Sequence, residues 1–246
     1  MHKSLCVVAV VLGIAGCSRP SSSQFSNLSD EFVHTTLSFS PSGATAAGLH
    51  QYNGQNLDDQ LDDVSPAAFD KERKFYLDFR QRLGGLSTDK LSTEERADLT
   101  IIQDQISLAL LETDEIHNSL HNPTVYVETL GNALFSPFVV EYAPLPARLR
   151  SIIARLEKVP LFLDQAETNL VSSPDIWTKV AIEENDGNID LVDKAIRAKV
   201  PADLQGAYTK AAATALPAMR KFQEFLKNSL SARNDAEPFG FQDPIE

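Results

Sequence analysis

Two histidines near the middle of the chain have a spacing that could bind a metal ion. His117 and His121 are four residues apart, and zincin metallopeptidases bind zinc with two histidines at this spacing on one helix face. In those enzymes a glutamate after the first histidine activates the metal-bound water, but here that position is Asn118, which cannot accept a proton. We interpret both histidines as residues of a last helical turn, where the helix dipole favours positive charge. The alternative, a metal site completed by Glu128 or by a partner's carboxylate, stays open.

Four aspartates close together form a second candidate site. Asp58, Asp59, Asp62 and Asp63 could suggest a calcium loop, but they lack the D-x-D-x-D-G spacing and the later bidentate glutamate. We therefore predict a solvated acidic loop. The sequence also has no glycine-rich phosphate loop and no G-x-S-x-G nucleophile motif. The residues define no catalytic set and no metal site, so no cofactor is expected from this chain.

The first residues have the pattern of an exported lipoprotein. A basic start and an apolar run of about ten residues predict a signal peptide over residues 1–16, since that run is too short to span a bilayer. Ile14-Ala15-Gly16-Cys17 resembles the bacterial lipobox, in which the cysteine thiol is alkylated by a diacylglyceryl group. We predict that Cys17 carries the lipid anchor and that residues 17–26, which are rich in serine, form a flexible tether. The alternative is an ordinary signal peptide that contains a cysteine.

Charge and cysteine content limit the partners. The formal net charge is −12, and the clusters of lysine and arginine that nucleic acid requires are absent from the sequence. Cys6 leaves with the signal peptide and Cys17 carries the lipid, so no disulfide is expected. We expect membrane contact through the lipid on Cys17, with the body facing the periplasm. In a bacterium with two membranes, Ser18 favours the outer membrane.

The rest of the chain, residues 27–246, is predicted to be all-α, as an array of amphipathic antiparallel helices. Apolar residues recur at spacings of three and four, start and stop signals flank these stretches, and alternating strand patterns are absent from the sequence. The expected helices are 65–83, 92–121, 149–170 with a break or kink at Pro160, 173–196 with an interruption at 186–188, and 201–230 with a kink at Pro217.

A motif near the start of this region resembles a known family. The run from Pro41 to Gly54, PSGATAAGLHQYNG, is followed by Leu57-Asp58-Asp59, and together they resemble the start of the bacterial family called domain of unknown function 885. Later blocks at 122–126, 148–160 and 165–170 are also similar to that family, in the same order. The resemblance implies a mainly helical, exported zinc metallopeptidase with an H-E-x-x-x-G-H type segment in its C-terminal half.

This sequence contains no such segment, so the resemblance places no metal ligand and no general base on it. Zinc is expected only where the family's C-terminal half is present. His50 and Tyr52 match the N-terminal motif, and we regard them as candidate cleft-lining residues. The alternative is that Gly48 and His50 end a short helix and enter a loop.

Two hypotheses of function follow. In the first, the protein is an exported, lipid-anchored helical protein that corresponds to the non-catalytic N-terminal portion of a zinc metallopeptidase and is inactive alone. In the second, it is a stand-alone helical lipoprotein of the cell envelope that binds a peptide or protein partner.

Overall fold

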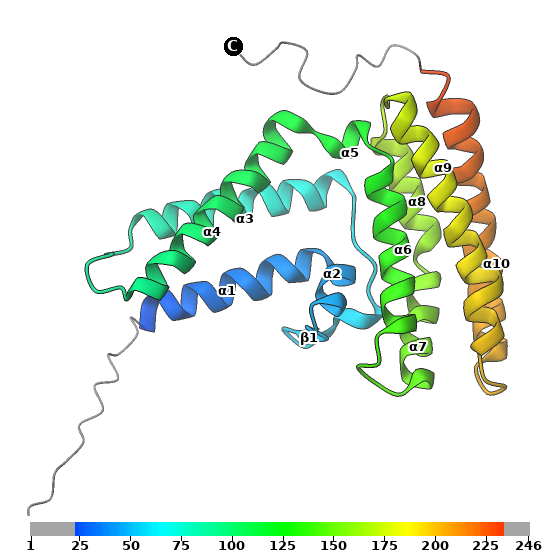
Figure 1. The fold of residues 1–246 in the computed structure, drawn as a ribbon, viewed down its shortest axis with the longest axis horizontal. Coiled ribbons are helices and arrows are strands. Elements are labelled where there is room, and N and C mark those ends of the chain that lie inside the picture. The colour runs from blue at the N-terminus through cyan, green and yellow to red at the C-terminus, as the bar shows by residue number, and fades with distance from the viewer. Residues whose placement is uncertain (1–22, 234–246) are drawn as a thin grey trace, which may run out of the picture.

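The computed structural model describes residues 23–233. The predicted signal peptide, the predicted lipidation site Cys17, most of the predicted tether and the tail from residue 234 lie outside the described residues. Within residues 23–233 the chain forms ten α-helices and one hairpin of two very short strands. The prediction of an all-α fold is confirmed. The helices form two groups with separate apolar cores (Figure 1).

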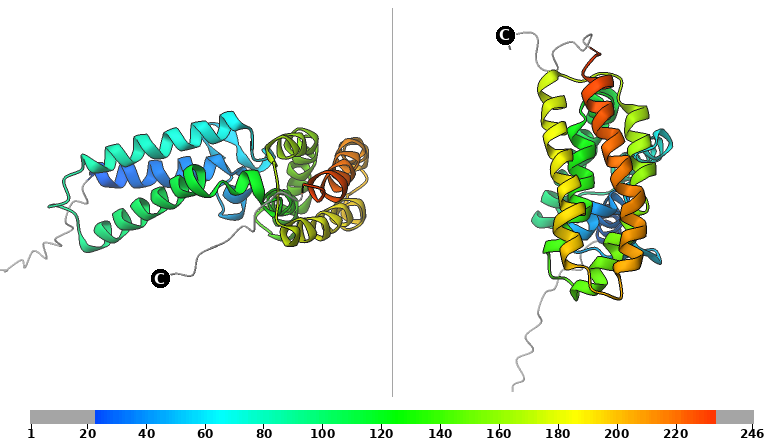
Figure 2. Two further views of the ribbon diagram at one scale, coloured as in Figure 1. Left: turned by 90° about the horizontal axis from the view of Figure 1, so that it is seen from above. Right: turned by 90° about the vertical axis from the view of Figure 1, so that its right-hand side faces the viewer.

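The smaller group, which we call the arm, consists of three helices: α1 (Ser23–Phe39), α3 (Pro66–Gly84) and α4 (Thr93–Leu111). Aromatic side chains of α1 and α3 and aliphatic side chains of α4 share its core. Phe79 is fully buried, and its ring centroid is 5.1 Å from that of Phe32. Viewed from two directions, the arm helices run across the axis of the second group (Figures 1 and 2). The arm is therefore a separate layer with its own core.

The larger group, which we call the bundle, consists of α6 (Thr124–Val139), α7 (Leu145–Leu156), α8 (Val159–Asn169), α9 (Asp175–Asp190) and α10 (Gln205–Glu224). Two of these helices are extended by π-helical segments, α9 by Leu191–Ile196 and α10 by Phe225–Leu230. A 3₁₀ turn, Arg197–Lys199, follows the first extension. Figure 2 shows these helices end-on, packed around the larger core.

The segment between the arm helices α1 and α3 packs against the bundle, and we call it the connecting segment. It contains α2 (Pro41–Ala46), the strands β1 (Gln51–Tyr52) and β2 (Gln55–Asn56), and a 3₁₀ turn, Leu57–Asp59. The strands pair antiparallel, with Gln51 opposite Asn56. Asn53 and Gly54 between them have φ of 48° and 76°, which is the backbone of a tight hairpin turn. Strands of two residues are too short to show alternation, so only the Asn-Gly pair could have predicted the hairpin.

Several predicted helix ends are confirmed. The Ser65 side chain accepts a hydrogen bond from the backbone of Ala68 at the start of α3. At the start of α4, Ser92 and Glu95 form the reciprocal capping box that their spacing predicts. The predicted break at Pro160 is also found, since α7 ends at Leu156 and α8 begins at Val159.

Two other helix predictions were wrong. The helix expected to reach His121 ends at Leu111; a π-helical turn, Glu112–Ile116, follows it, and His117 then adopts a left-handed φ of 57°. The interruption expected at residues 186–188 does not occur in α9. There the buried Asn188 side chain donates a hydrogen bond to the backbone oxygen of Val127, so a polar residue with poor helix propensity is stabilised by a tertiary contact.

The tether boundary also needs correction. We predicted a flexible segment through residue 26, but α1 begins at Ser23 and Phe25 is only 2% exposed. Phe25, Leu28 and Phe32 share one face of α1 and pack into the core of the arm. The serine-rich composition concealed the start of this apolar stripe. The folded body therefore includes residues 23–26.

A glycine allows the close packing of α6 against α9. A Cβ atom added at Gly131 would lie 2.7 Å from the side-chain oxygen of Asn188, whereas Gly187 has no atom within 4 Å of such a Cβ. Gly131→Ala must displace Asn188 from its bond to Val127, so we expect unfolding free energy to fall by about 1–2 kcal/mol. Gly187→Ala should raise it by about 0.5–1 kcal/mol through helix propensity.

Urea unfolding of both variants would check this pair of predictions. Effects of the same sign at the two glycines would contradict the role given to Gly131.

Candidate functional site

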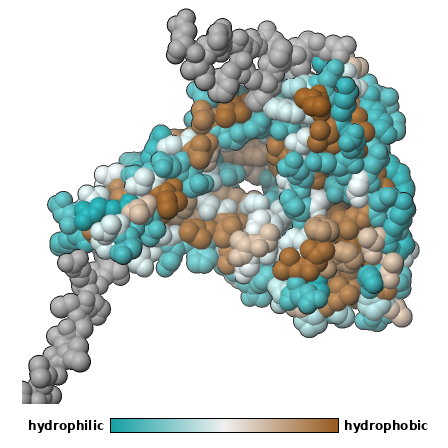
Figure 3. Space-filling model, viewed as in Figure 1, coloured by the Kyte–Doolittle hydropathy of each residue, from teal (hydrophilic) through white to brown (hydrophobic). Residues whose placement is uncertain are grey.

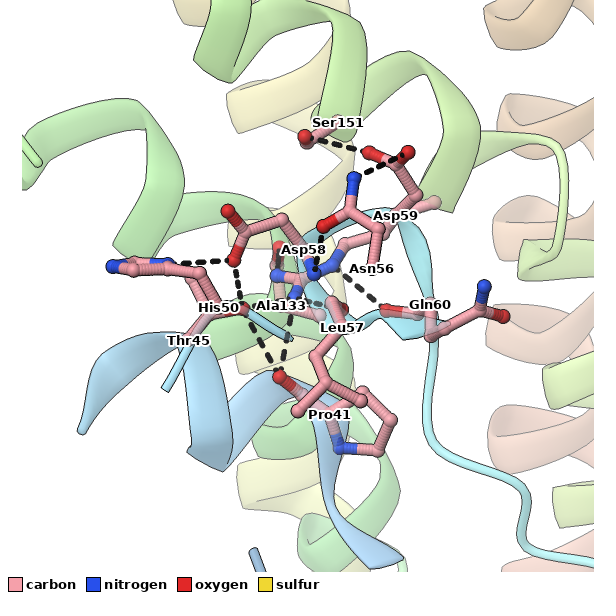
Figure 4. A network of polar contacts seen from close by, with 11 residues as sticks. Pro41, Thr45, His50, Asn56, Leu57, Asp58, Asp59, Gln60, Ala133 and Ser151 are labelled. Carbon is pink, nitrogen blue, oxygen red and sulfur yellow. Dashed lines mark hydrogen bonds and ion pairs between the residues drawn. The ribbon is translucent and has the colours of Figure 1, made fainter. Parts of the chain in front are cut away.

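The family-like motif surrounds a buried arginine. Arg155 on α7 is 0% exposed, and its guanidinium lies among backbone oxygens of several chain segments. Figure 4 labels residues that surround it, among them Thr45, Leu57 and Ala133. The Arg155 Nη2 donates to the Thr45 hydroxyl at 2.6 Å. Nη2 also reaches the backbone oxygens of Pro41 and Leu57, whereas Nε donates to that of Gln60 and Nη1 to that of Ala133. A guanidinium has five N–H donors in a fixed plane, which suits it to join segments far apart in sequence.

The Asp58 carboxylate is linked to this guanidinium through the Thr45 hydroxyl. Its Oδ1 accepts a hydrogen bond from the Thr45 hydroxyl at 2.8 Å, so Thr45 lies between the guanidinium and the carboxylate. Burial lowers the pKa of Arg155, and the nearby Asp58 carboxylate opposes that shift. The positive charge is thus held mainly by neutral carbonyl oxygens.

His50 lies at the outer edge of this network. Its Nδ1 is 2.9 Å from the same Asp58 oxygen, and its ring stacks on Tyr142 with centroids 4.3 Å apart. The side chain is 34% exposed, and in Figure 4 its other nitrogen points away from the network. Burial raises the pKa of the Tyr142 hydroxyl to about 12, so this phenol is neutral near pH 7. A histidine oriented by a carboxylate in this way can present one nitrogen to a ligand or a proton.

Tyr52 contacts the arm instead. Its hydroxyl is 3.2 Å from the Thr35 hydroxyl on α1, and its ring stacks on His34 with centroids 5.6 Å apart. The two motif residues therefore hold the hairpin to different groups of helices, His50 on the bundle side and Tyr52 on the arm side. Gly48 follows the end of α2 and has a φ of 84°. This agrees with the alternative interpretation of the motif, in which Gly48 ends a short helix and the chain enters a loop. That His50 and Tyr52 line a ligand cleft stays a prediction.

The prediction of a solvated acidic loop is wrong for Asp58, which is buried, whereas Asp63 is exposed. Asp59 accepts a hydrogen bond from Ser151 on α7, and Asp62 accepts from the Ser40 hydroxyl and the Ser42 backbone before and within α2. Asp63 accepts from the backbone of Ser65 and the side chain of Gln165. With Asp58 bonded to Thr45 and His50, every one of the four has a partner, because the connecting segment folds on itself and against α7 and α8.

The histidine pair does not form the helix-face arrangement that its spacing suggested. His117 precedes the four-residue helix α5 (Asn118–His121), and the turn at its left-handed backbone separates it from α4. The His121 Nδ1 lies 3.0 Å from the Ser172 hydroxyl. Among residues 23–233, no group of three histidine, cysteine or acidic side chains is placed to hold a metal ion.

A hollow between the arm and the bundle was not predicted. It encloses about 460 Å³ and is lined by residues of α3, α4, α6 and α8, including Phe69, Glu72, His117 and Val125. Figure 3 shows that the molecule is hollowed between the two groups of helices. Burial raises the pKa of Glu72, although the Tyr76 hydroxyl donates a hydrogen bond to its carboxylate. The residues come from distant segments, so no local sequence signal could have identified this hollow.

The raised pKa of Glu72 predicts a pH-dependent stability. A carboxyl whose pKa is higher in the folded state favours folding below its unfolded pKa, and this contribution is lost as pH rises through the folded pKa. We therefore expect Glu72→Gln to be more stable than the native protein at pH 7 but not at pH 4, as measured by urea unfolding. The exposed Asp78 on the same helix provides a control, Asp78→Asn, with a change within about 0.5 kcal/mol. An equal difference at both pH values would contradict the prediction.

The fold and the site define a class of protein: a two-part helical body whose connecting segment is held by a buried arginine. The chain belongs to the family described as "Bacterial protein of unknown function (DUF885)", whose model matches residues 41–243. The match begins at Pro41, the first residue of the motif that suggested the family.

A solved structure is similar to this chain over most of the length of this chain. It is described as "a putative lipoprotein of unknown function from Shewanella oneidensis", with a TM-score of 0.75 and 19% identity over 85% of this chain. This chain spans 38% of the length of that protein. The search of curated proteins found no match. No helix within residues 23–233 is both long and apolar enough to cross a membrane.

Proposed function

We propose that this protein is an exported, lipid-anchored member of its family whose helical body is the non-catalytic N-terminal portion of a zinc metallopeptidase fold. On this proposal the body is a scaffold and does not cleave peptides alone. The observation that carries this proposal is that residues of the family motif make structural contacts in the folded body. Thr45 and Asp58 are both engaged with the buried Arg155 network, and the Asp58 carboxylate also fixes one His50 nitrogen.

The scaffold role has a physical basis in these contacts. The connecting segment carries the motif, contacts the arm through Tyr52 and is held to the bundle by Arg155. It therefore fixes the position of the arm relative to the bundle. A fixed position is what a catalytic portion would require from a supporting one, because reacting groups must be held within a fraction of an ångström. The 38% share of the longer Shewanella protein that this chain spans agrees with a supporting portion.

The purified chain, incubated with a mixture of peptides and added zinc, tests this proposal. We expect no cleavage above the rate without protein and no zinc retained in stoichiometric amount after dialysis. Cleavage that a chelator abolishes would overturn the proposal. The DNA beyond the codon for Glu246 offers a second test: an H-E-x-x-x-G-H segment in frame, or after a frameshift, would support it, and an unrelated gene would favour the stand-alone hypothesis.

The lipid anchor has its own test. Mass spectrometry of the N-terminal peptide should show a diacylglyceryl group on Cys17, and Cys17→Ser should release the protein from membranes. Fractionation should place the native protein in the outer membrane of a bacterium with two membranes; recovery in the inner membrane would contradict the role given to Ser18.

The second hypothesis, a stand-alone lipoprotein that binds a peptide or protein partner, is favoured by one observation. The hollow between the arm and the bundle has mostly apolar walls together with the polar groups of Glu72 and His117. That combination is typical of small-molecule and peptide sites. Saturable binding of a peptide by this chain would favour this hypothesis.

A further inference from the structure

One face of the bundle exposes apolar side chains along a single helix. On α6, Phe135 is 50% exposed and Val139 is 46% exposed, and Val140 directly after the helix is 48% exposed. These three residues, with Glu128 and Asn132 on the same side of α6, are called the α6 face below. Figure 3 shows apolar side chains gathered on this side of the bundle, around the lower ends of α6 and α9. Large apolar side chains grouped on one surface commonly mark an interaction site.

Two hollows flank the α6 face. One, of about 600 Å³, lies between α6 and α9, and the other, of about 500 Å³, lies between α6 and α2. Asn132 and Phe135 line both of them, so these two side chains form a ridge between two grooves. Helices pack by placing the ridges of one into the grooves of another. The shape of this surface therefore fits a helix.

The groove between α6 and α9 also contains a carboxyl oxygen without a hydrogen-bond donor. One carboxylate oxygen of Glu184 is buried and has no hydrogen-bond partner within residues 23–233. Burial raises the pKa of Glu184, and the neighbouring Glu128 raises it further. Lys194, on the same groove, is already paired with Asp190 at 2.8 Å. A buried acceptor without a donor is costly, so a cationic group from outside would be stabilised here.

We propose that the α6 face binds a helix of the family's catalytic portion, with apolar side chains of that helix in the two grooves and one of its lysines or arginines paired with Glu184. This inference rests on the proposed function, because it assigns the surface through which the supporting portion meets the catalytic one. The length relation supports the choice of occupant. The Shewanella protein of the same fold is much longer than this chain, which spans 38% of it, and its additional chain needs a surface to pack against.

Photocrosslinking in cells that make the native protein tests the proposal. Phe135→p-benzoylphenylalanine places a reactive group on the ridge, and mass spectrometry identifies the crosslinked peptide. We expect the crosslinked peptide to come from a polypeptide segment that carries the H-E-x-x-x-G-H motif. That segment can belong to the same chain or to another chain. The control is Leu161→p-benzoylphenylalanine, since Leu161 on α8 is 65% exposed and lines neither groove. Glu184→Gln should reduce the yield at position 135 by about tenfold, the loss of one charge-assisted hydrogen bond.

Other results would overturn the proposal. These are a crosslink to a second copy of this chain, to its own residues 234–246 or to an unrelated protein, an equal yield at positions 135 and 161, and no crosslink at all. A failure of the proposed function can be distinguished from a failure of this inference, because it would appear as chelator-sensitive cleavage of peptides by the purified chain. A chain that is inactive but crosslinks elsewhere would overturn only the assignment of the α6 face.

Discussion

Arg155→Met is expected to lower the free energy of unfolding by about 3–5 kcal/mol. Methionine can occupy the space of the aliphatic stem, but it removes every donor that reaches the Thr45 hydroxyl and the surrounding carbonyl oxygens. The Ala133 oxygen would lose this donor, and Pro137 four residues later has no N–H to replace it. The favourable charge interaction between Arg155 and Asp58 would also be lost. Urea unfolding followed by circular dichroism measures the change.

Arg150 on the same helix provides the matched control. Its side chain is 61% exposed, and its Nη2 is 3.9 Å from an oxygen of Asp203. Exposed ion pairs contribute little, so Arg150→Met should change the unfolding free energy by no more than about 0.5 kcal/mol. Similar effects of the two substitutions would show that Arg155 does not hold the connecting segment.

Phe25→Ala is expected to lower the free energy of unfolding by about 3–4 kcal/mol, because it leaves a cavity in the core of the arm. The residue lies within the segment predicted to be a tether, so the measurement tests directly whether the folded body begins at Ser23. Hydrogen exchange on the same variant should show the largest loss of protection in the arm helices, since the bundle has a separate core.

Phe135→Ala serves as the control for the same change of side chain at an exposed position. Phe135 is 50% exposed, so its truncation in the isolated chain should have an effect below about 1 kcal/mol. If Phe25→Ala were equally mild, residues 23–26 would have to be regarded as part of the tether after all.

The sequence by itself determined the features that depend on neighbouring residues. The capping box of Ser92 and Glu95 was predictable because both bonds close within three residues, and the break at Pro160 because proline has no backbone N–H. Helical periodicity predicted the all-α class. The order of the motif blocks identified the family, whose model matches residues 41–243.

The tertiary structure alone decided what the charged residues do. Asp58 and its neighbours looked solvated because their partners, among them Thr45, Ser151 and Gln165, come from other parts of the chain. Arg155 gave no local sign of burial, since a buried guanidinium is tolerable only when carbonyl oxygens from several segments surround it. Likewise, the groove between α6 and α9 and the groove between α6 and α2 exist only after these helices have packed together. Hydrogen-bond partners and grooves depend on how distant segments meet, and neither periodicity nor local spacing contains that information.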